Sequence, residues 1–141
     1  MQKTFLKSLE LTEEAALTKY KLAPLSTRRD IAMLGLVHRT VLGQGPPHFA
    51  RWFFLAEPAE HKHWTRSREN SHPLQLHDYV DGKHNELLRR SALGVPKVYN
   101  KLPKKVVNCK SVKAFQRELQ KLVVTELKRG STAWSTCLSA R

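Results

Sequence analysis

The amino-acid sequence predicts a mainly α fold: a small helical domain with a long His-rich loop or a short β-hairpin in its middle. Apolar residues recur at spacings of three and four along residues 28–42 and 112–128, which is typical of amphipathic helices. Between these two segments, residues 57–86 are polar and weakly periodic. At 141 residues, 40% of them hydrophobic, the chain is long enough to bury a core.

We expect residues 1–141 to form a single domain or fragment. Its parts are a helical part (1–56), a polar loop (57–86), a basic extended segment with the C-terminal helix (87–129), and a frayed tail (130–141). The tail is expected to fray because its sequence shows no helical or strand period.

The first twenty residues have a helical pattern with a second helix start at Thr12. Glu13 and Glu14 follow this residue, and acidic side chains suit the positive end of a helix dipole. A short helix over about residues 13–20 is therefore expected. Pro24 should end the helical run, because proline disfavours the helical conformation at the residue before it.

The next helix is predicted over roughly residues 28–42. Thr27, followed by Asp30, fits a capping box at its start, and Gly43 fits its end. Arg28 and Arg29 lie at the positive end of this helix dipole, where cations are unfavourable by a few tenths of a kcal/mol. Their position indicates that they have a partner.

A turn at residues 43–47 precedes a short aromatic helix that a proline can start. Its large apolar side chains are Phe49, Trp52, Phe53 and Leu55. Core positions are the preferred interpretation of the aromatic side chains among them, and a platform for stacking nucleic-acid bases is the alternative.

The polar loop contains five histidines: His61, His63, His72, His77 and His84. Structural zinc sites usually have closely paired ligands, often cysteines, and no cysteine lies here. We therefore expect a polar, pH-sensitive loop and no metal site. Within it, residues 74–80 alternate like a strand and end at an Asp81-Gly82 turn.

The C-terminal helix has the clearest signals, because Ser111 can cap its start and Gly130 can close it. One side of residues 112–128 is apolar and must be buried. The other side carries a basic ridge roughly 27 Å long at about 1.5 Å per residue. The ridge consists of Lys110, Lys113, Arg117, Lys121 and Lys128. It can be an ordinary solvated helix face or a surface that follows a phosphate backbone.

Before this helix, the chain interleaves lysines with prolines and one tyrosine. The candidate nucleic-acid-binding residues are Lys97, Tyr99, Lys101, Lys104, Lys105 and Lys110, continued by Lys113, Arg117 and Lys121. Prolines favour an extended backbone, from which lysines could reach phosphates while Tyr99 stacks on a base. The alternative is a charged linker that packs Tyr99 and Leu102 onto the last helix.

Charge favours a polyanionic partner. The formal net charge is +13, of which residues 61–141 supply +11. Each phosphate neutralised by a cation releases counterions, so RNA or DNA is the expected partner through backbone phosphates. No apolar run approaches the ~20 residues that span a bilayer, so no membrane partner is expected. We expect an intracellular protein, nuclear or cytoplasmic, with Cys109 and Cys137 reduced; one disulfide is the alternative.

No catalytic constellation is visible. The chain has three aspartates, Asp30, Asp78 and Asp81, whereas two-metal phosphoryl transfer needs clustered carboxylates. Residues 79–82 (YVDG) resemble the start of a polymerase Tyr-x-Asp-Asp turn, but glycine stands in place of the second carboxylate. We expect no catalytic residue and no cofactor.

Several short motifs resemble the C-terminal end of the reverse-transcriptase polyprotein of non-LTR (LINE-type) retrotransposons. They are Arg90-Ser91, residues 98–103 (VYNKLP), 106–107 (VV), 111–115 (SVKAF) and Leu119. In that family, an Arg-Ser pair and an aromatic-Asn-x-Leu-Pro step precede a Ser-x-x-x-Phe-x-x-x-Leu helix. Upstream, residues 22–34 and 38–43 resemble the helical region after the polymerase thumb. Tyr99 departs from the family, which often has Trp there.

The resemblance covers roughly residues 12–127 and rests on the order and spacing of these motifs. It implies an accessory segment of an RNA-directed DNA polymerase that helps to hold template RNA or target DNA near the polymerase core. The magnesium-binding aspartates of that core would lie upstream of Met1, so this chain alone is expected to be inert. The alternative function is a protein–protein interaction module that docks through exposed amphipathic helices.

Overall fold

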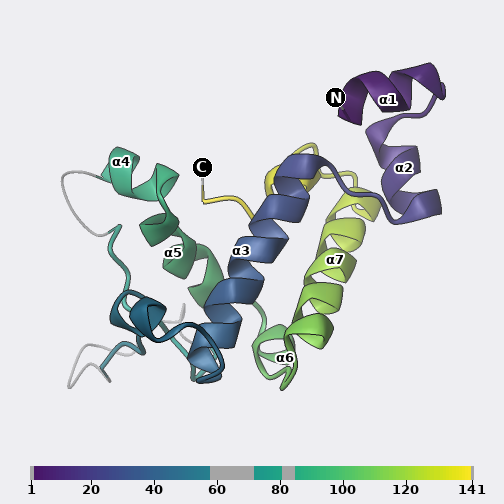
Figure 1. Cartoon of the computed structure of the whole chain (residues 1–141). Helices are drawn as coiled ribbons and strands as arrows, with labels where there is room; N and C mark the ends of the chain where they lie inside the picture. The colour runs from purple at the N-terminus through teal and green to yellow at the C-terminus, as the bar shows by residue number, and fades with distance from the viewer. Residues whose placement is uncertain (1, 58–71, 81–84, 141) are drawn as a thin grey trace.

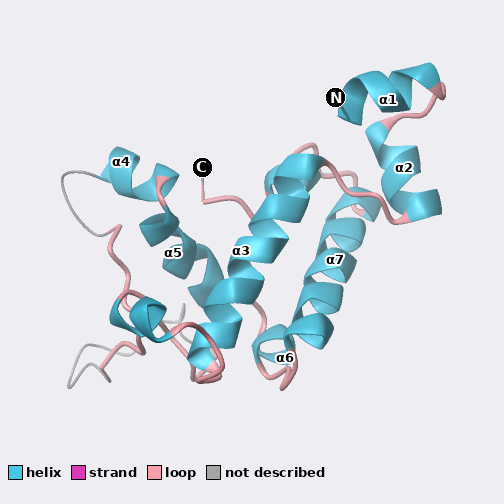
Figure 2. Cartoon of the chain, in the orientation of Figure 1, coloured by secondary structure: helices cyan, strands magenta, loops and turns pink. Residues whose placement is uncertain are grey.

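The computed structural model describes residues 2–57, 72–80 and 85–140 (Figure 1). The predicted mainly α class is confirmed, because helices joined by turns and loops make up this part of the chain, without a strand (Figure 2). Leu55 and Leu76 form an isolated antiparallel bridge in place of the strand predicted over residues 74–80. Most of the predicted polar loop, with its Asp81-Gly82 turn, lies outside the described residues.

The helices follow one another along the chain, and those labelled η are 3-10 helices. They are α1 (Gln2–Ser8), α2 (Glu13–Tyr20), α3 (Leu25–Val41), η1 (Pro47–Arg51), α4 (Asn85–Arg90), η3 (Ala92–Gly94), α5 (Val95–Asn100), α6 (Lys104–Val107), α7 (Val112–Lys128) and η4 (Trp134–Thr136).

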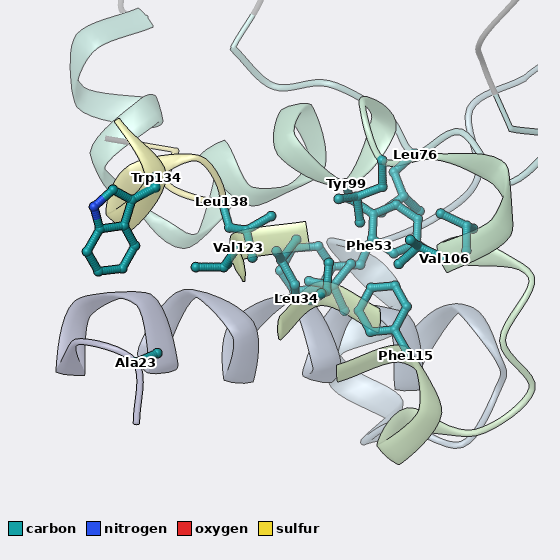
Figure 3. Close-up of a cluster of buried hydrophobic side chains, with 14 of the residues drawn as sticks. Ala23, Leu34, Phe53, Leu76, Tyr99, Val106, Phe115, Val123, Trp134 and Leu138 are labelled. Atoms are coloured by element: carbon teal, nitrogen blue, oxygen red, sulfur yellow. The ribbon is translucent and has the colours of Figure 1, made fainter. Parts of the chain in front are cut away.

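The two longest of these helices, α3 and α7, pack side by side in opposite directions and form the centre of the fold (Figure 1). Their apolar faces meet in one cluster, to which α5, α6 and the C-terminal segment also contribute (Figure 3). Gly35 of α3 faces Gln116 of α7, and a Cβ atom at Gly35 would lie 2.5 Å from the Gln116 amide nitrogen. The missing side chain therefore leaves room for the flexible amide end of Gln116 between the two helices.

Local capping signals account for the helix ends that the sequence predicts. The Thr12 hydroxyl accepts a hydrogen bond from the Ala15 amide (3.1 Å), and the Ser111 hydroxyl accepts one from Ala114 (3.2 Å). Gly130 follows α7 with a φ of +75°, the left-handed conformation that glycine adopts without strain. The predicted boundaries of α2 and α7 are confirmed.

The predicted capping box at Thr27 is wrong. Helix α3 begins at Leu25, directly after Pro24, so Thr27 lies within its first turn. The Thr27 side chain is buried, and its hydroxyl donates to the Ser135 carbonyl at 2.8 Å. A distant part of the chain therefore uses the hydroxyl that the local pattern assigned to the helix end.

The basic segment before α7 is helical, in contrast to the extended conformation that its prolines suggested. Pro96 occupies the first turn of α5, where a missing N–H costs no intrahelical hydrogen bond. Pro103 is the N-cap residue of α6, in an extended conformation. Both prolines start helices here.

The predicted frayed tail is also wrong. Residues after Gly130 fold back onto α3 and α7 through η4. Trp134 and Leu138 are buried, with Leu138 near Val123 of α7 (Figure 3). Burial of two large side chains stabilises this segment although it lacks a periodic pattern.

Candidate nucleic-acid interface

The predicted binding residues separate into a buried tyrosine and two groups of cations. Lys97 lies in α5 and Lys101 directly follows it; both line one cavity. The other cations lie on α6, before α7, or on α7, and all of their side chains are exposed: Lys104, Lys105, Lys110, Lys113, Arg117 and Lys121.

A shallow groove of about 390 Å³ lies between α3 and α7, and cations from both helices line it. Lys113 and Arg117 are one helical turn apart on α7, and Arg28 comes from the start of α3. Gln116 and Gln120 add amide groups, and no acidic residue lines the groove. This arrangement offers charge and hydrogen-bond donors to an anion that lies along the two helices. We call it the α3–α7 groove.

Arg28 also contacts the N-terminal helix, because its guanidinium donates to the Gln2 side chain at 3.3 Å. Gln2 is therefore a partner of Arg28, as the unfavourable position of this arginine at the helix start predicted. Arg28 was absent from the predicted binding residues. It joins Lys113 and Arg117 only because α3 and α7 pack together, and a sequence pattern carries no signal for that contact.

Glu118 of α7 offsets part of the positive charge of the basic ridge. It forms an ion pair with Lys121, and the hydrogen bond from Lys121 lowers the pKa of Glu118. The positive charges of Lys105 and Arg117 lower that pKa further. Within the described residues, no ion pair engages Lys113 or Arg117, so their charges remain available to a ligand.

Tyr99 cannot stack on a base, because its side chain is fully buried in the core. The alternative interpretation, in which Tyr99 and Leu102 pack against the last helix, agrees with the structure, where both belong to the core cluster with Phe115. Its ring lies 6.1 Å from that of Phe115, centroid to centroid. The alternation of lysines around Tyr99 suggested an exposed tyrosine, but α5 turns Tyr99 inward together with Pro96.

Tyr99 is hydrogen-bonded to a buried histidine. Its hydroxyl lies 2.9 Å from Nδ1 of His38, and Nε2 of His38 lies 2.7 Å from the Cys109 carbonyl oxygen. A carbonyl only accepts, so Nε2 carries the hydrogen and Nδ1 accepts the Tyr99 hydroxyl hydrogen. Burial lowers the pKa of His38 below 6.5, the Cys109 hydrogen bond opposes this shift, and the charge of His72 adds to it.

His72 belongs to the core and not to the polar loop in which it was expected. Its Nε2 lies 2.9 Å from the Tyr99 carbonyl oxygen, to which it donates. The Asn100 side chain donates to the Leu76 carbonyl (2.8 Å) and accepts from the Leu76 amide (2.7 Å). Residues 72–76 are thus fixed to the end of α5. His61, His63 and His84 lie outside the described residues.

The aromatic segment after η1 divides between core and surface. Phe53 is buried and Phe49 packs against the core, as expected, whereas Trp52 is 51% exposed. Trp52 lies 6.5 Å from the Tyr79 ring, and Phe54 stacks on His77 at 5.2 Å. The preferred core interpretation was therefore wrong for Trp52.

The described part of the chain contains neither a group of metal-ligating side chains nor a membrane-spanning helix. No cluster of three or more metal-ligating side chains occurs among residues 2–57, 72–80 and 85–140. Cys109 and Cys137 are free thiols. None of the described helices is long and apolar enough to cross a bilayer.

Comparisons with known proteins give no relative: no family model, no curated protein and no solved structure matches this chain.

Proposed function

We propose that this chain is a C-terminal accessory segment of a retrotransposon reverse transcriptase, inert by itself, that binds RNA or DNA through backbone phosphates. The motifs around Tyr99 and Phe115 support the family. The observation that carries the binding function is the α3–α7 groove, where Arg28, Lys113 and Arg117 meet without an acidic side chain. In the intact enzyme, the polymerase core would supply the catalysis and this segment would hold the strand.

Binding of this kind is electrostatic and indifferent to sequence. Lys113 and Arg117 project from adjacent turns of α7, so a phosphate backbone lying along the groove meets a cation at each turn. Arginine can hold a phosphate through two parallel hydrogen bonds, and lysine contributes a point charge. Phosphate contacts carry no base information, and each one releases condensed counterions. Affinity should therefore fall steeply with salt and depend little on sequence.

The test is the salt dependence of binding to a fixed RNA and to a DNA duplex. A variant with Arg28, Lys113 and Arg117 replaced by Gln should flatten the slope of log K against log salt by about 2 to 3. A matched variant removes the same charge elsewhere, at Lys7, Lys19 and Arg51, whose side chains are exposed. Equal losses in both variants would show that net charge alone drives binding and that the groove has no special part.

A second candidate function is supported by exposed apolar side chains near the N-terminus. Phe5 (56% exposed), Leu9 (52%) and Tyr20 (57%) lie on or beside α1 and α2, and α1 buries only Leu6. The apolar faces of α3 and α7, in contrast, are satisfied within the chain. Under this alternative, α1 and α2 dock on a protein, for which the polymerase core is the natural candidate.

The two functions separate by mutation. Replacing Phe5 and Leu9 by Ser should abolish association with a co-expressed polymerase core and leave RNA affinity unchanged. The groove variant should do the reverse. Loss of RNA affinity in the Phe5 and Leu9 variant, with its helix content unchanged by circular dichroism, would contradict this division of roles.

A further inference from the structure

A second basic site lies away from the α3–α7 groove, in a cavity of about 530 Å³ between α5, α7 and the C-terminal segment. A neighbouring cavity of about 300 Å³ shares Arg89, Val98, Leu138 and Ala140 with it. The larger cavity falls within the usual size range of small-molecule sites, about 300 to 1,000 Å³.

The lining of the larger cavity is divided by chemistry. Its apolar part comes from Val98, Leu102, Leu122 and Leu138, of which Leu102 and Leu138 are buried. Its cationic part comes from three side chains, Arg89, Lys97 and Lys101. Lys97 and Lys101 are four residues apart and so lie one helical turn apart. A ligand that satisfies both parts has an apolar portion and an anionic portion.

The charge balance in this cavity favours an anion. Glu126 is its acidic lining residue, and Arg129 holds the Glu126 carboxylate at 2.9 Å. No ion pair engages Arg89, Lys97 or Lys101 within the described residues. Among the residues that line the larger cavity, three cations therefore face one carboxylate that already has a partner, and Asp30 lines the neighbouring cavity.

We propose that this cavity binds a single unpaired nucleotide, with its phosphate on Lys97, Lys101 and Arg89 and its base against Val98, Leu102 and Leu138. The choice of a nucleotide rests on the proposed function, since other amphiphilic anions share its general chemistry. A nucleotide unites a planar base with a phosphate, which matches the two parts of the lining. In a duplex the base is paired and cannot enter, so the cavity gives the chain a preference for unpaired strands.

Cys137 provides a direct readout, because it lines the cavity while the other thiol, Cys109, does not. Burial raises the pKa of the Cys137 thiol, and the negative charges of Glu126 and Asp30 raise it further, so alkylation is best followed at mildly alkaline pH. Peptide mapping by mass spectrometry after treatment with iodoacetamide reports both cysteines in one sample. Cys109 is the internal control.

The experiment measures the alkylation rate of Cys137 in the full chain with AMP, inorganic phosphate, single-stranded RNA or duplex RNA. AMP at about four times its Kd should slow Cys137 alkylation about fivefold, because the reactive fraction is 1/(1 + [L]/Kd). Cys109 alkylation should not change. Protection by AMP alone identifies a free nucleotide as the ligand, and protection by single-stranded RNA as well identifies an unpaired residue of a strand.

Two variants test the parts of the cavity separately. Ala140→Trp fills the cavity without changing charge, since Ala140 lines both cavities near the chain end. The pair Lys97→Gln and Lys101→Gln removes charge without filling space. Each should abolish protection by AMP and lower single-strand affinity toward that of the duplex. The proposal is overturned if AMP, at up to about 10 times the RNA concentration that saturates the protein, leaves Cys137 alkylation unchanged. It is also overturned if inorganic phosphate or duplex RNA protects Cys137 as well as AMP does.

Failure of this proposal is distinguishable from failure of the proposed function. The variant of Arg28, Lys113 and Arg117 should weaken duplex and single-stranded RNA alike and leave AMP protection of Cys137 intact. If duplex affinity is insensitive to salt, the phosphate-binding function of the α3–α7 groove fails, whatever AMP does at Cys137.

Discussion

Tyr99 and His38 share a hydrogen bond of 2.9 Å inside the protein, although 61 residues separate them in the sequence. The His38 ring also stacks on Phe115, with ring centroids 4.0 Å apart and planes 8° from parallel. Through these contacts His38 joins α3 to both α5 and α7. A polar side chain thus occupies the middle of the apolar core, where all of its hydrogen-bonding capacity is used.

The Tyr99→Phe variant should be less stable than the wild type by about 1 to 3 kcal/mol. Removal of the hydroxyl leaves Nδ1 of His38 as a buried acceptor without a partner, and such groups cost about that much. Urea unfolding followed by circular dichroism measures the change. Tyr20→Phe is the matched control, because Tyr20 is 57% exposed and should change stability little. Equal stabilities of the two variants would contradict the role of the Tyr99 hydroxyl.

Stability should fall as pH decreases below 6.5. Burial lowers the pKa of His38 in the folded protein, so the unfolded chain binds more protons in this range. The free energy of unfolding is then greatest above the unfolded pKa and decreases as the pH falls toward the folded one. Urea titrations at several pH values should show this slope.

The pH slope should belong to His38. Between about pH 7.5 and about pH 5, a range that spans the ordinary histidine pKa of 6.5, the stability of His38→Gln should change less with pH than that of the wild type. This holds whatever the stability of the variant at neutral pH. His48→Gln removes an exposed histidine of η1 and should keep the wild-type slope. A slope that is the same in all three proteins would contradict the assignment.

Leu119→Ala should cost about 2 to 5 kcal/mol of stability, because Leu119 is fully buried between α7 and the rest of the core. Leu87→Ala makes the same chemical change at a helix position that is 73% exposed. It should stay within about 0.5 kcal/mol of the wild type. Thermal or urea unfolding distinguishes the two, and a large effect of Leu87→Ala would show that α4 is buried against something in solution.

Gly94→Ala should destabilise the turn between α4 and α5 by about 1 to 3 kcal/mol. A Cβ atom at Gly94 would lie 2.4 Å from the Arg89 carbonyl oxygen and 2.8 Å from its Cα, and backbone atoms cannot give way locally. Gly35→Ala is the comparison, because its Cβ meets the flexible amide end of Gln116. Unfolding measurements should show a clearly smaller loss for Gly35→Ala, and the reverse order would refute the steric argument.

Local signals predict the parts of this fold that local interactions determine. Helix α7 combines a capping serine, a regular apolar face and a closing glycine, so the sequence alone gives its residues. Pro96 and Pro103 were misread because proline suits both an extended chain and a helix start, and only packing decides between them. The sequence has one signal for the burial of Trp134 and Leu138, the four-residue spacing of these large apolar side chains. A single spacing in a short segment does not predict burial.

The candidate site was predictable only in part. The cations of α7 follow from the helical period, and their exposure agrees with it. The contribution of Arg28 to the groove and of Arg89 to the cavity depends on contacts between helices. Tyr99 is buried and not exposed for base stacking, because its inward position depends on His38, a partner in a different helix.

The hydrogen bond from Thr27 to the Ser135 carbonyl spans 108 residues, and the one from His38 to the Cys109 carbonyl spans 71. Helix α7 ends at Lys128, 87 residues after Val41 at the end of α3. A ribosome adds about 5 to 20 residues per second, so α3 emerges roughly 4 to 17 seconds before the helix that covers it. During that interval its apolar face is open to water and to other nascent chains.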